Sequence, residues 1–391
     1  MGTERETSTD LWLPSTTMRQ ACADAVNRIA ALYPKTSGND SIVNDMMSVL
    51  TSEYPDSSLS DGPPPGDAVS ADGTPLEISI RTRAAGDVEV RWDMNVAPGI
   101  AGRTVDARRN AWEAGRRVAK RLEQRFGANL EVFDRLADLL VPDQANGGRL
   151  IGFASGLPLK GTPRFQCYFT GGPGPGSDLQ VLQAASALGM RASADAIAGR
   201  LSAADRIWMA ADLVKGADAR VKLYASLQSY DIDQIESFRS IAGEYWPVDD
   251  VRSLLTKLYG EVPRVPPRNT GAILCFHFRE GKVTEVAFDV GTSPFEIDLA
   301  DDEMLSDGEI LRRFSAILND LGLSSEPYER AVATFAGLPL EEETAIQQRV
   351  AFLRDHRGLA ATMYLGPRFY VHRFGFAYQD LGREGSEQSR E

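Results

Sequence analysis

The stretch that decides the fold is Ala219-Arg220-Val221-Lys222-Leu223-Tyr224-Ala225. Successive side chains of a strand point to opposite faces, so this alternation of apolar and polar residues predicts a strand. Its polar face carries Arg220, Lys222 and Tyr224. Two cations on one strand face repel each other, and the stretch holds no acid that could offset them. We therefore expect this face to line a cavity that binds an anion such as a diphosphate; the alternative is a polar face that simply lies in water.

Length and hydropathy limit the classes of protein to consider. At 391 residues the chain is long enough for two or three domains, although large barrels of this size form one domain. No run of eighteen apolar residues exists, so we expect no membrane span. The acidic, polar residues 1–6 do not have the pattern of a signal peptide.

The net charge and the cysteine content limit which binding partners and which cellular compartment we expect. The net charge of -13 disfavours binding to nucleic acid or to an anionic membrane, which makes the local pair of cations more informative. The three cysteines, Cys22, Cys167 and Cys275, are scattered and odd in number. This usage predicts a reduced, cytoplasmic protein without a disulfide framework.

Pairs of segments in which apolar and polar residues alternate recur along the chain. A short link joins the two members of each pair, which predicts antiparallel strands, because parallel strands need a long crossover. The five expected pairs are 75–81 with 88–95, 149–154 with 164–170, 207–214 with 219–226, 271–278 with 283–290, and 359–365 with 368–376. Segments with helical periodicity lie before and between them: 18–32, 42–50, 106–126, 129–140, 178–188, 193–201, 232–242, 248–259, 307–321, 327–335 and 342–352.

The unit of a helix, two antiparallel strands and a helix therefore occurs five times, at intervals of roughly seventy residues. In each unit one strand face is apolar and the other carries polar or aromatic groups. We expect an α+β fold: a closed, ten-stranded antiparallel barrel with a solvated centre and helices outside, since closure removes strand edges and a wide barrel can enclose a chamber. The pattern disfavours a TIM barrel, whose strands alternate singly with helices. We expect one domain over residues 1–391, with tails at 1–13 and 380–391; within the first tail, the apolar residues Leu11-Trp12-Leu13 could dock on the core.

The predicted inner faces carry cations, phenols, histidines and one prominent carboxylate. These residues are Glu77, Arg91, Gln166, Tyr168, Arg220, Lys222, Tyr224, His277, Tyr370 and His372. Pro75-Leu76-Glu77-Ile78-Ser79, Arg91 in the following strand, and Arg220-x-Lys222-x-Tyr224 together resemble the aromatic prenyltransferases of the αββα (ABBA) barrel type. The pattern is most similar to the indole, or dimethylallyltryptophan-synthase-like, branch of that family.

This resemblance implies a role for each matching position. Glu77 corresponds to the carboxylate that accepts the indole N–H. Arg91, Arg220 and Lys222 correspond to the cations that bind diphosphate, with Gln166 at a position where family members often carry lysine. The expected aromatic shield of the allylic cation, which also contacts the diphosphate, is Tyr168, Tyr224 and Tyr370. Trp208, His277 and His372 are possible residues of the acceptor pocket.

The resemblance also implies a reaction. A dimethylallyl or longer prenyl group passes from an allylic diphosphate to the indole ring of tryptophan or of a tryptophan-derived metabolite, by electrophilic aromatic substitution without a metal or other cofactor. The setting would be alkaloid secondary metabolism, in a cytoplasmic monomer or homodimer. Besides Gln166, two departures are the absence of a lysine in Leu150–Ala154 and Phe374 where another tyrosine is common. Donor length, regiochemistry, normal versus reverse prenylation and the final base stay open.

Alternatives remain at the level of the sequence. The barrel could prenylate a phenol or naphthoquinol, or could bind a small anion without catalysis; Glu77 could be a structural partner of Arg91. His277 and His372 could serve packing or hydrogen bonding. Gly171–Gly176 could cradle a phosphate, but its two prolines lack amide donors, which favours an ordinary loop. Asp301-Asp302-Glu303 resembles the aspartate clusters that hold magnesium in other prenyltransferases, but it lies in a polar surface loop.

Overall fold

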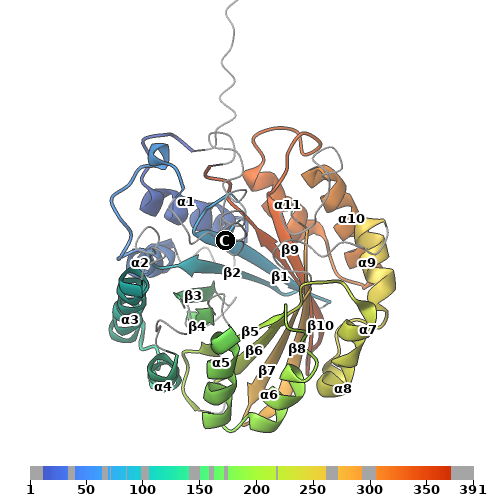
Figure 1. Ribbon diagram of the computed structural model, residues 1–391. Helices are drawn as coiled ribbons and strands as arrows, with labels where there is room; N and C mark the ends of the chain where they lie inside the picture. The colour runs from blue at the N-terminus through green and yellow to red at the C-terminus, as the bar shows by residue number, and fades with distance from the viewer. Residues whose placement is uncertain are drawn as a thin grey trace, which may run out of the picture.

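A computed structural model of the protein describes residues 12–33, 40–63, 69–70, 72–84, 86–97, 105–140, 150–157, 163–170, 175–216, 219–260, 272–292 and 305–370. Its centre is a closed barrel in the strand order β1-β10-β9-β8-β7-β6-β5-β4-β3-β2 (Figure 1). Every neighbouring pair is antiparallel, and β1 closes the barrel against β10. The expected ten-stranded antiparallel barrel is confirmed.

The ten strands form five hairpins. Their bounds are β1 Leu76–Arg83, β2 Val88–Asn95, β3 Leu150–Leu157, β4 Arg164–Thr170, β5 Arg206–Asp212, β6 Val221–Ser226, β7 Ala272–Arg279, β8 Lys282–Gly291, β9 Gln347–Asp355 and β10 Gly358–Leu365. Because all neighbours are antiparallel, the five hairpin links lie at one end of the barrel, which we call the hairpin end. The connections that pass through helices lie at the opposite end, the helix end.

Helices surround the barrel (Figure 1). They are α1 Met18–Ala31, α2 Asp40–Leu50, α3 Val105–Phe126, α4 Glu131–Leu139, α5 Pro175–Ala187, α6 Arg191–Ala198, α7 Ile232–Ser237, α8 Arg239–Ala242, α9 Val251–Tyr259, α10 Asp307–Asp320 and α11 Glu326–Phe335. Several begin at side-chain caps that satisfy free amide groups of the first turn. Thr17 caps α1, Asp250 caps α9 and Ser306 caps α10.

The main hydrophobic core lies between the outer barrel face and the helices. On β1, Leu76, Ile78 and Ile80 are fully buried on the outer face, as the period of two requires. Aromatic pairs join the layers: Phe133 of α4 lies 6.3 Å from Phe153 of β3, measured between ring centroids. The helices are thus needed to cover the apolar side of the barrel, and the polar side is left to face the centre.

The fifth hairpin differs from its predicted position. Residues 342–352 were expected to be helical, but β9 begins at Gln347, and its partner is β10 at Gly358–Leu365 instead of residues 368–376. The reason is that Ala351 and Leu353, on the inner face of β9, are apolar like their outward neighbours Val350 and Phe352. The run Val350–Leu353 therefore shows no alternation, and its pattern is also typical of a buried helix.

The chain after β10 packs outside the barrel, against the start of the chain. Trp12 is 5% exposed; its Nε1 donates to the carbonyl oxygen of Pro367 at 2.9 Å, and its ring lies edge-on to Phe369 at 5.0 Å. Within the expected tail at residues 1–13, Trp12 is therefore docked, and residues 1–11 lie outside the described residues. The predicted tail at 380–391 lies outside the described residues.

We expect Trp12→Ala to lower the free energy of unfolding by about 3 kcal/mol, because truncating a buried aromatic side chain loses its burial and leaves a cavity. Urea denaturation measures the change. Leu13→Ala is the adjacent control, since Leu13 is 69% exposed and should contribute almost nothing. Equal stability of the two variants would show that Trp12 does not anchor the chain.

Candidate active site

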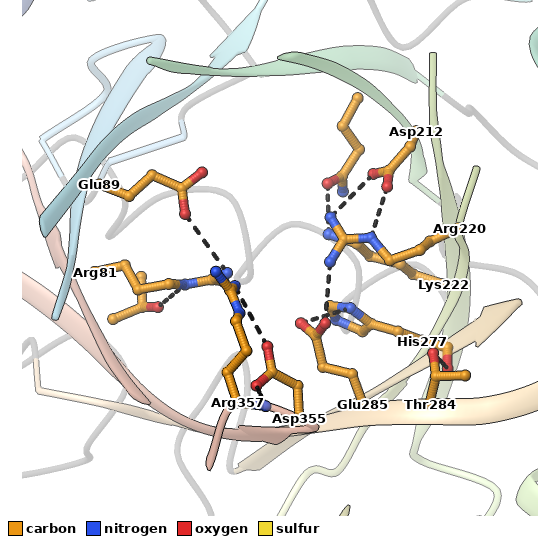
Figure 2. A network of polar contacts seen from close by, with 12 residues as sticks. Arg81, Glu89, Asp212, Arg220, Lys222, His277, Thr284, Glu285, Asp355 and Arg357 are labelled. Atoms are coloured by element: carbon orange, nitrogen blue, oxygen red, sulfur yellow. Dashed lines mark hydrogen bonds and ion pairs between the residues drawn. The ribbon is translucent and has the colours of Figure 1, made fainter. Parts of the chain in front are cut away.

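A cavity of about 300 Å³ opens at the hairpin end of the barrel. Its lining is strongly basic, with seven cations, Arg81, Arg91, Arg164, Lys215, Arg220, Arg279 and Arg357, against two acids, Glu89 and Asp212. Figure 2 shows Arg81 and Glu89 pointing to the barrel centre from one side, and Arg220 and Lys222 from the opposite side. Arg220 of the opening stretch thus lines this cavity, and Lys222 is buried inside the barrel, so the polar face of the stretch is not a solvated outer face.

Arg220, immediately before β6, is held by carboxylates from the adjacent strand β5 and from β8, the second strand on its other side. Its Nε donates to Asp212 Oδ2 at 2.6 Å, and its Nη1 lies 3.0 Å from Glu285 Oε2 (Figure 2). Burial lowers the pKa of Arg220, but Asp212 and Glu285 outweigh burial and raise the pKa above its ordinary value. Acids from β5 and β8, which the stretch itself lacks, therefore offset this cation before any anion binds.

Lys222 lies deeper in the chamber and is 3% exposed. Its ammonium donates to Oε1 of Gln166, and it lies opposite His277 in the β6–β7 register. Burial lowers the pKa of Lys222 to about 8, and the positive charge of Arg220 adds to this decrease. Lys222 is therefore a cation whose charge changes near neutral to mildly alkaline pH.

His277 and Glu285 form a buried pair beside these cations. His277 Nδ1 lies 2.9 Å from Glu285 Oε1 (Figure 2). Burial lowers the pKa of His277 to about 3, although Glu285 acts in the opposite direction, so the ring is neutral at physiological pH. The structure thus places His277 among the cations.

Arg91 and Arg81 occupy the other side of the chamber. Arg81 donates from Nε to Thr362 Oγ1 at 3.0 Å and lies 3.8 Å from Glu89 Oε2. Arg91 lies opposite Gly156, where an added Cβ would come within 3.3 Å of the Arg91 Cγ. The absence of a side chain at Gly156 therefore leaves room for Arg91 to lie along the inner wall.

Aromatic rings line the inner face from the middle of the barrel toward the helix end. Trp208 and Tyr224 stack with centroids 5.3 Å apart and planes 10° apart, and Tyr168 lies 6.0 Å from Tyr224. The hydroxyl of Tyr224 accepts a hydrogen bond from Gln166 Nε2 at 3.5 Å. Gln166 therefore connects the cation cluster, through Lys222, to the aromatic rings.

Tyr370 does not belong to this group. It is fully buried outside the barrel, where its backbone N–H donates to Asp72 Oδ2 at 3.0 Å. The position inside the barrel is filled by Tyr364 of β10, which lies opposite Ser79 of β1 and Arg349 of β9. Continuing the inner-face alternation through the expected strand 359–365 would have identified Tyr364. His372, the other residue expected on that segment, lies outside the described residues.

Glu77 lies on the inner face of β1 and is 8% exposed, opposite Asp93 of β2. Burial raises the pKa of Tyr364, and the charges of Asp289, Asp93 and Glu77 add to this increase, so these carboxylates lie near the ring. Tyr168 donates from its hydroxyl to Asp93 Oδ1 at 3.3 Å, and Arg349 lies 2.9 Å from Asp289 Oδ1. Asp93 and Asp289 are site residues that the sequence reasoning missed.

One section of the inner wall is apolar. Trp208, Tyr224, Cys275, Ala287, Leu353 and Ala360 are successive partners across β5 to β10, and we call this row the inner apolar belt. Cys275, Ala287, Leu353 and Ala360 form a cluster that is separate from the main core, and Tyr224 packs against it. Tyr224 of the belt is the next inward-facing residue after Lys222 on β6. The belt therefore offers an apolar surface directly next to the cations.

Two other motifs lie mostly outside the described residues. These are Gly171–Gly174 of the glycine-proline run, whose last two residues begin α5, and Asp301-Asp302-Glu303. In the part of the chain that the structure describes, no three His, Cys, Asp or Glu side chains are grouped as metal ligands. Among the described helices, none has the length and apolarity needed to cross a bilayer.

Comparisons with known proteins agree with this geometry. The family model described as tryptophan dimethylallyltransferase matches residues 58–330. Comparison with curated proteins gives no match. Solved structures with the same fold include the prenyltransferase PriB in binary complex with product diphosphate, at 21% identity and a TM-score of 0.75, over 91% of this chain and 97% of PriB.

Two further solved structures share this fold. The 5-dimethylallyl tryptophan synthase from Streptomyces coelicolor, in complex with DMASPP and Trp, has 20% identity and a TM-score of 0.74 over 91% of this chain and 97% of that one. The 6-dimethylallyltryptophan synthase from Micromonospora olivasterospora, in complex with the same two compounds, has 21% identity and a TM-score of 0.75 over 91% and 98%.

The pKa of Lys222 leads to a pH prediction for anion binding. Lys222 is charged below a pH of about 8 and neutral above it, so affinity for sulfate, which does not titrate in this range, should fall as pH rises. The fraction of charged lysine, and with it the affinity, should fall about tenfold between pH 7 and 9. Calorimetric titration measures it, with Lys222→Arg as the control that stays charged. Equal pH dependence in both proteins would show that Lys222 does not bind the anion.

Proposed function

The chain belongs to the tryptophan dimethylallyltransferase family, and we propose that it transfers a prenyl group from an allylic diphosphate to the indole ring of tryptophan or of a tryptophan-derived metabolite. One observation supports the proposal above all others. Successive inner residues of β6 are a diphosphate-type cation, Lys222, and an aromatic ring, Tyr224, within a chamber that also holds Glu77. The two halves of the reaction, loss of an anion and capture of a carbocation, thus have adjacent binding groups.

The cations act on the leaving group. Breaking the C–O bond of the donor leaves a diphosphate anion, and Arg91, Arg220 and Lys222 are positioned to stabilise that developing charge, with Gln166 beside them. Fixed charges in a water-excluded site need no reorganisation during the reaction, which is why they can lower the barrier. The bonds from Asp212 and Glu285 to Arg220 hold its guanidinium in place before the donor arrives.

The aromatic rings act on the allylic cation. Tyr168, Tyr224 and Tyr364 present π faces that stabilise a cation by roughly 0.5–2 kcal/mol each without forming a bond to it. The enclosed chamber also keeps water from the cation, which water would otherwise convert to an alcohol. The alkyl chain of the donor would lie along the inner apolar belt, next to its diphosphate at Lys222.

Glu77 acts on the acceptor. As the allylic cation bonds to the ring carbon, positive charge spreads to the indole nitrogen and its N–H becomes more acidic. An ionised carboxylate is a strong acceptor for that N–H, and the hydrogen bond strengthens in the transition state. The ring then loses the proton of the substituted carbon, which restores aromaticity. The charge of this proton balances that of the released diphosphate.

We propose that the enzyme acts on these small molecules in the cytoplasm, as a monomer or homodimer. All three cysteines are free thiols, which suits a reducing compartment.

Incubation with dimethylallyl or geranyl diphosphate and a panel of indoles, phenols and naphthols, read by mass, tests the function. We expect a prenylated indole and one released diphosphate per product. Turnover of phenols alone would favour the phenol-specific alternative. Diphosphate binding without any turnover would favour an anion-binding barrel.

Glu77→Gln keeps the shape of the side chain but removes its charge. We expect kcat to fall on the order of 10²-fold, as for other lost electrostatic stabilisers, with a smaller effect on acceptor KM. Steady-state kinetics measure both, with Glu326→Gln at the exposed first residue of α11 as the control. N1-methylated indole should be a poor substrate of the unmodified enzyme and should lose little further in the variant. A near-normal rate of Glu77→Gln on every acceptor would make Glu77 structural.

Metal independence is a separate prediction. Because arginine and lysine side chains can neutralise the diphosphate in place of Mg²⁺, turnover should persist in excess EDTA. The assay is the initial rate with and without chelator. Complete loss of activity that only a divalent ion restores would contradict the prediction.

The inner apolar belt predicts how donor length can be changed. Ala287→Phe adds a ring to the middle of the belt and should reduce the rate with geranyl diphosphate more than that with dimethylallyl diphosphate. Ala287→Val should give an intermediate effect. If competition between the two donors gave the same product ratio in all three proteins, the alkyl chain would lie elsewhere.

A further inference from the structure

Each of the five hairpins contributes a cation to the cavity at the hairpin end. Arg81 comes from β1, Arg164 from the start of β4, Lys215 from the β5–β6 link, Arg279 from the end of β7, and Arg357 from the β9–β10 link. None of these five belongs to the pattern of Arg91, Arg220 and Lys222 that the reaction itself uses. Arg81 is buried, whereas Arg164, Lys215, Arg279 and Arg357 form a second, outer set of cations, closer to solvent.

The charge of this region is opposite to that of the whole protein. The chain carries a net charge of -13, yet the cavity lining holds seven cations and two acids. The two acids are already engaged, since Asp212 bonds Arg220 and Glu89 lies 3.8 Å from Arg81. The lining therefore has a surplus of positive charge that the acids of the cavity do not offset.

The outer cations differ in whether a carboxylate pairs with them. Arg357 lies 3.4 Å from Asp355, whose stronger contact is with Arg83 at 2.7 Å. Arg164 and Lys215 are exposed, and no carboxylate of the described residues lies within ion-pair distance of either. Glu89 is attracted to Arg164 as well as to Arg81, but seven cations around one opening with two acids still repel each other, so an anionic ligand would relieve this repulsion.

The outer cations and the reaction site share one space. Arg91, Gln166 and Arg220 line the same cavity as Arg164 and Lys215. An anion that enters at the hairpin end therefore meets the outer cations before it reaches the inner ones, and a released anion passes them on its way out.

We propose that Arg164, Lys215, Arg279 and Arg357 form an outer binding station for diphosphate, which first binds the diphosphate group of the donor at the hairpin end and through which the product diphosphate leaves. The inference rests on the proposed function. A surplus of one charge in a cleft raises the local concentration of the opposite ion and its association rate by 10–10³-fold, and the effect weakens with salt. Transfer to a second set of cations also lets diphosphate leave the inner set stepwise.

Stopped-flow measurement of inorganic diphosphate binding tests the station, with Trp208 stacked on Tyr224 as the fluorescent reporter. The variant is Arg164→Glu with Lys215→Glu. The control is Arg191→Glu with Arg252→Glu, which makes the same change in net charge on the outer helices α6 and α9. We expect the association rate to fall about tenfold or more in the variant at low salt, to converge with that of the unmodified protein as salt rises, and to change little in the control.

The outcomes separate the two proposals. If the unmodified protein binds no diphosphate, the proposed function fails. If it binds diphosphate but the variant and the control associate at equal rates, the outer station is overturned and the proposed function stands. Arg164→Gln with Lys215→Gln, which removes charge without reversing it, should give about half of the logarithmic effect on the rate; no effect from it would also count against the station.

Discussion

The organisation of the chamber depends on the ion pairs that hold Arg220 between Asp212 and Glu285. Placing a guanidinium inside a barrel is unfavourable unless its charge is paired, because the lost hydration costs several kcal/mol per ion. Carboxylates from strands on both sides meet this need before any ligand is present. Under the proposed function the same acids reduce the net attraction for a donor, so diphosphate binding would need further cations such as Arg91, Lys222 and the hairpin residues.

Barrel closure explains why so many polar groups can face inward. In a closed sheet each strand has one outer and one inner face, and the helices cover only the outer one. The apolar core therefore lies outside the barrel and can stabilise the fold without the inner residues. This separation lets the inner face be chosen for chemistry: cations near the hairpins, aromatic rings and carboxylates toward the helix end, and an apolar belt across β5 to β10.

The sequence alone could predict the barrel because alternation with a period of two is a local property. It predicted the positions of β1 to β8 within a few residues, and the inward direction of Glu77, Arg91, Lys222 and Tyr224. It failed at β9 because Ala351 and Leu353 make both faces of that strand apolar, and this error placed Tyr370 instead of Tyr364 in the chamber. Asp212 and Glu285 were missed for another reason. The register between strands decides which acids meet Arg220, and the sequence of a single strand does not determine that register.

Gln166 shows how a departure from the family pattern fits the rest of the chamber. Family members often carry lysine at this position, but here burial and the charge of Arg220 already lower the pKa of Lys222. A second ammonium next to Lys222 would lower the pKa of Lys222 further. It also could not accept the hydrogen bond that Lys222 donates. The amide of Gln166 accepts from Lys222 through its oxygen and donates to the Tyr224 hydroxyl through its nitrogen. The site thus has one cation fewer, but the remaining ammonium has a hydrogen-bond acceptor that fixes it beside Tyr224.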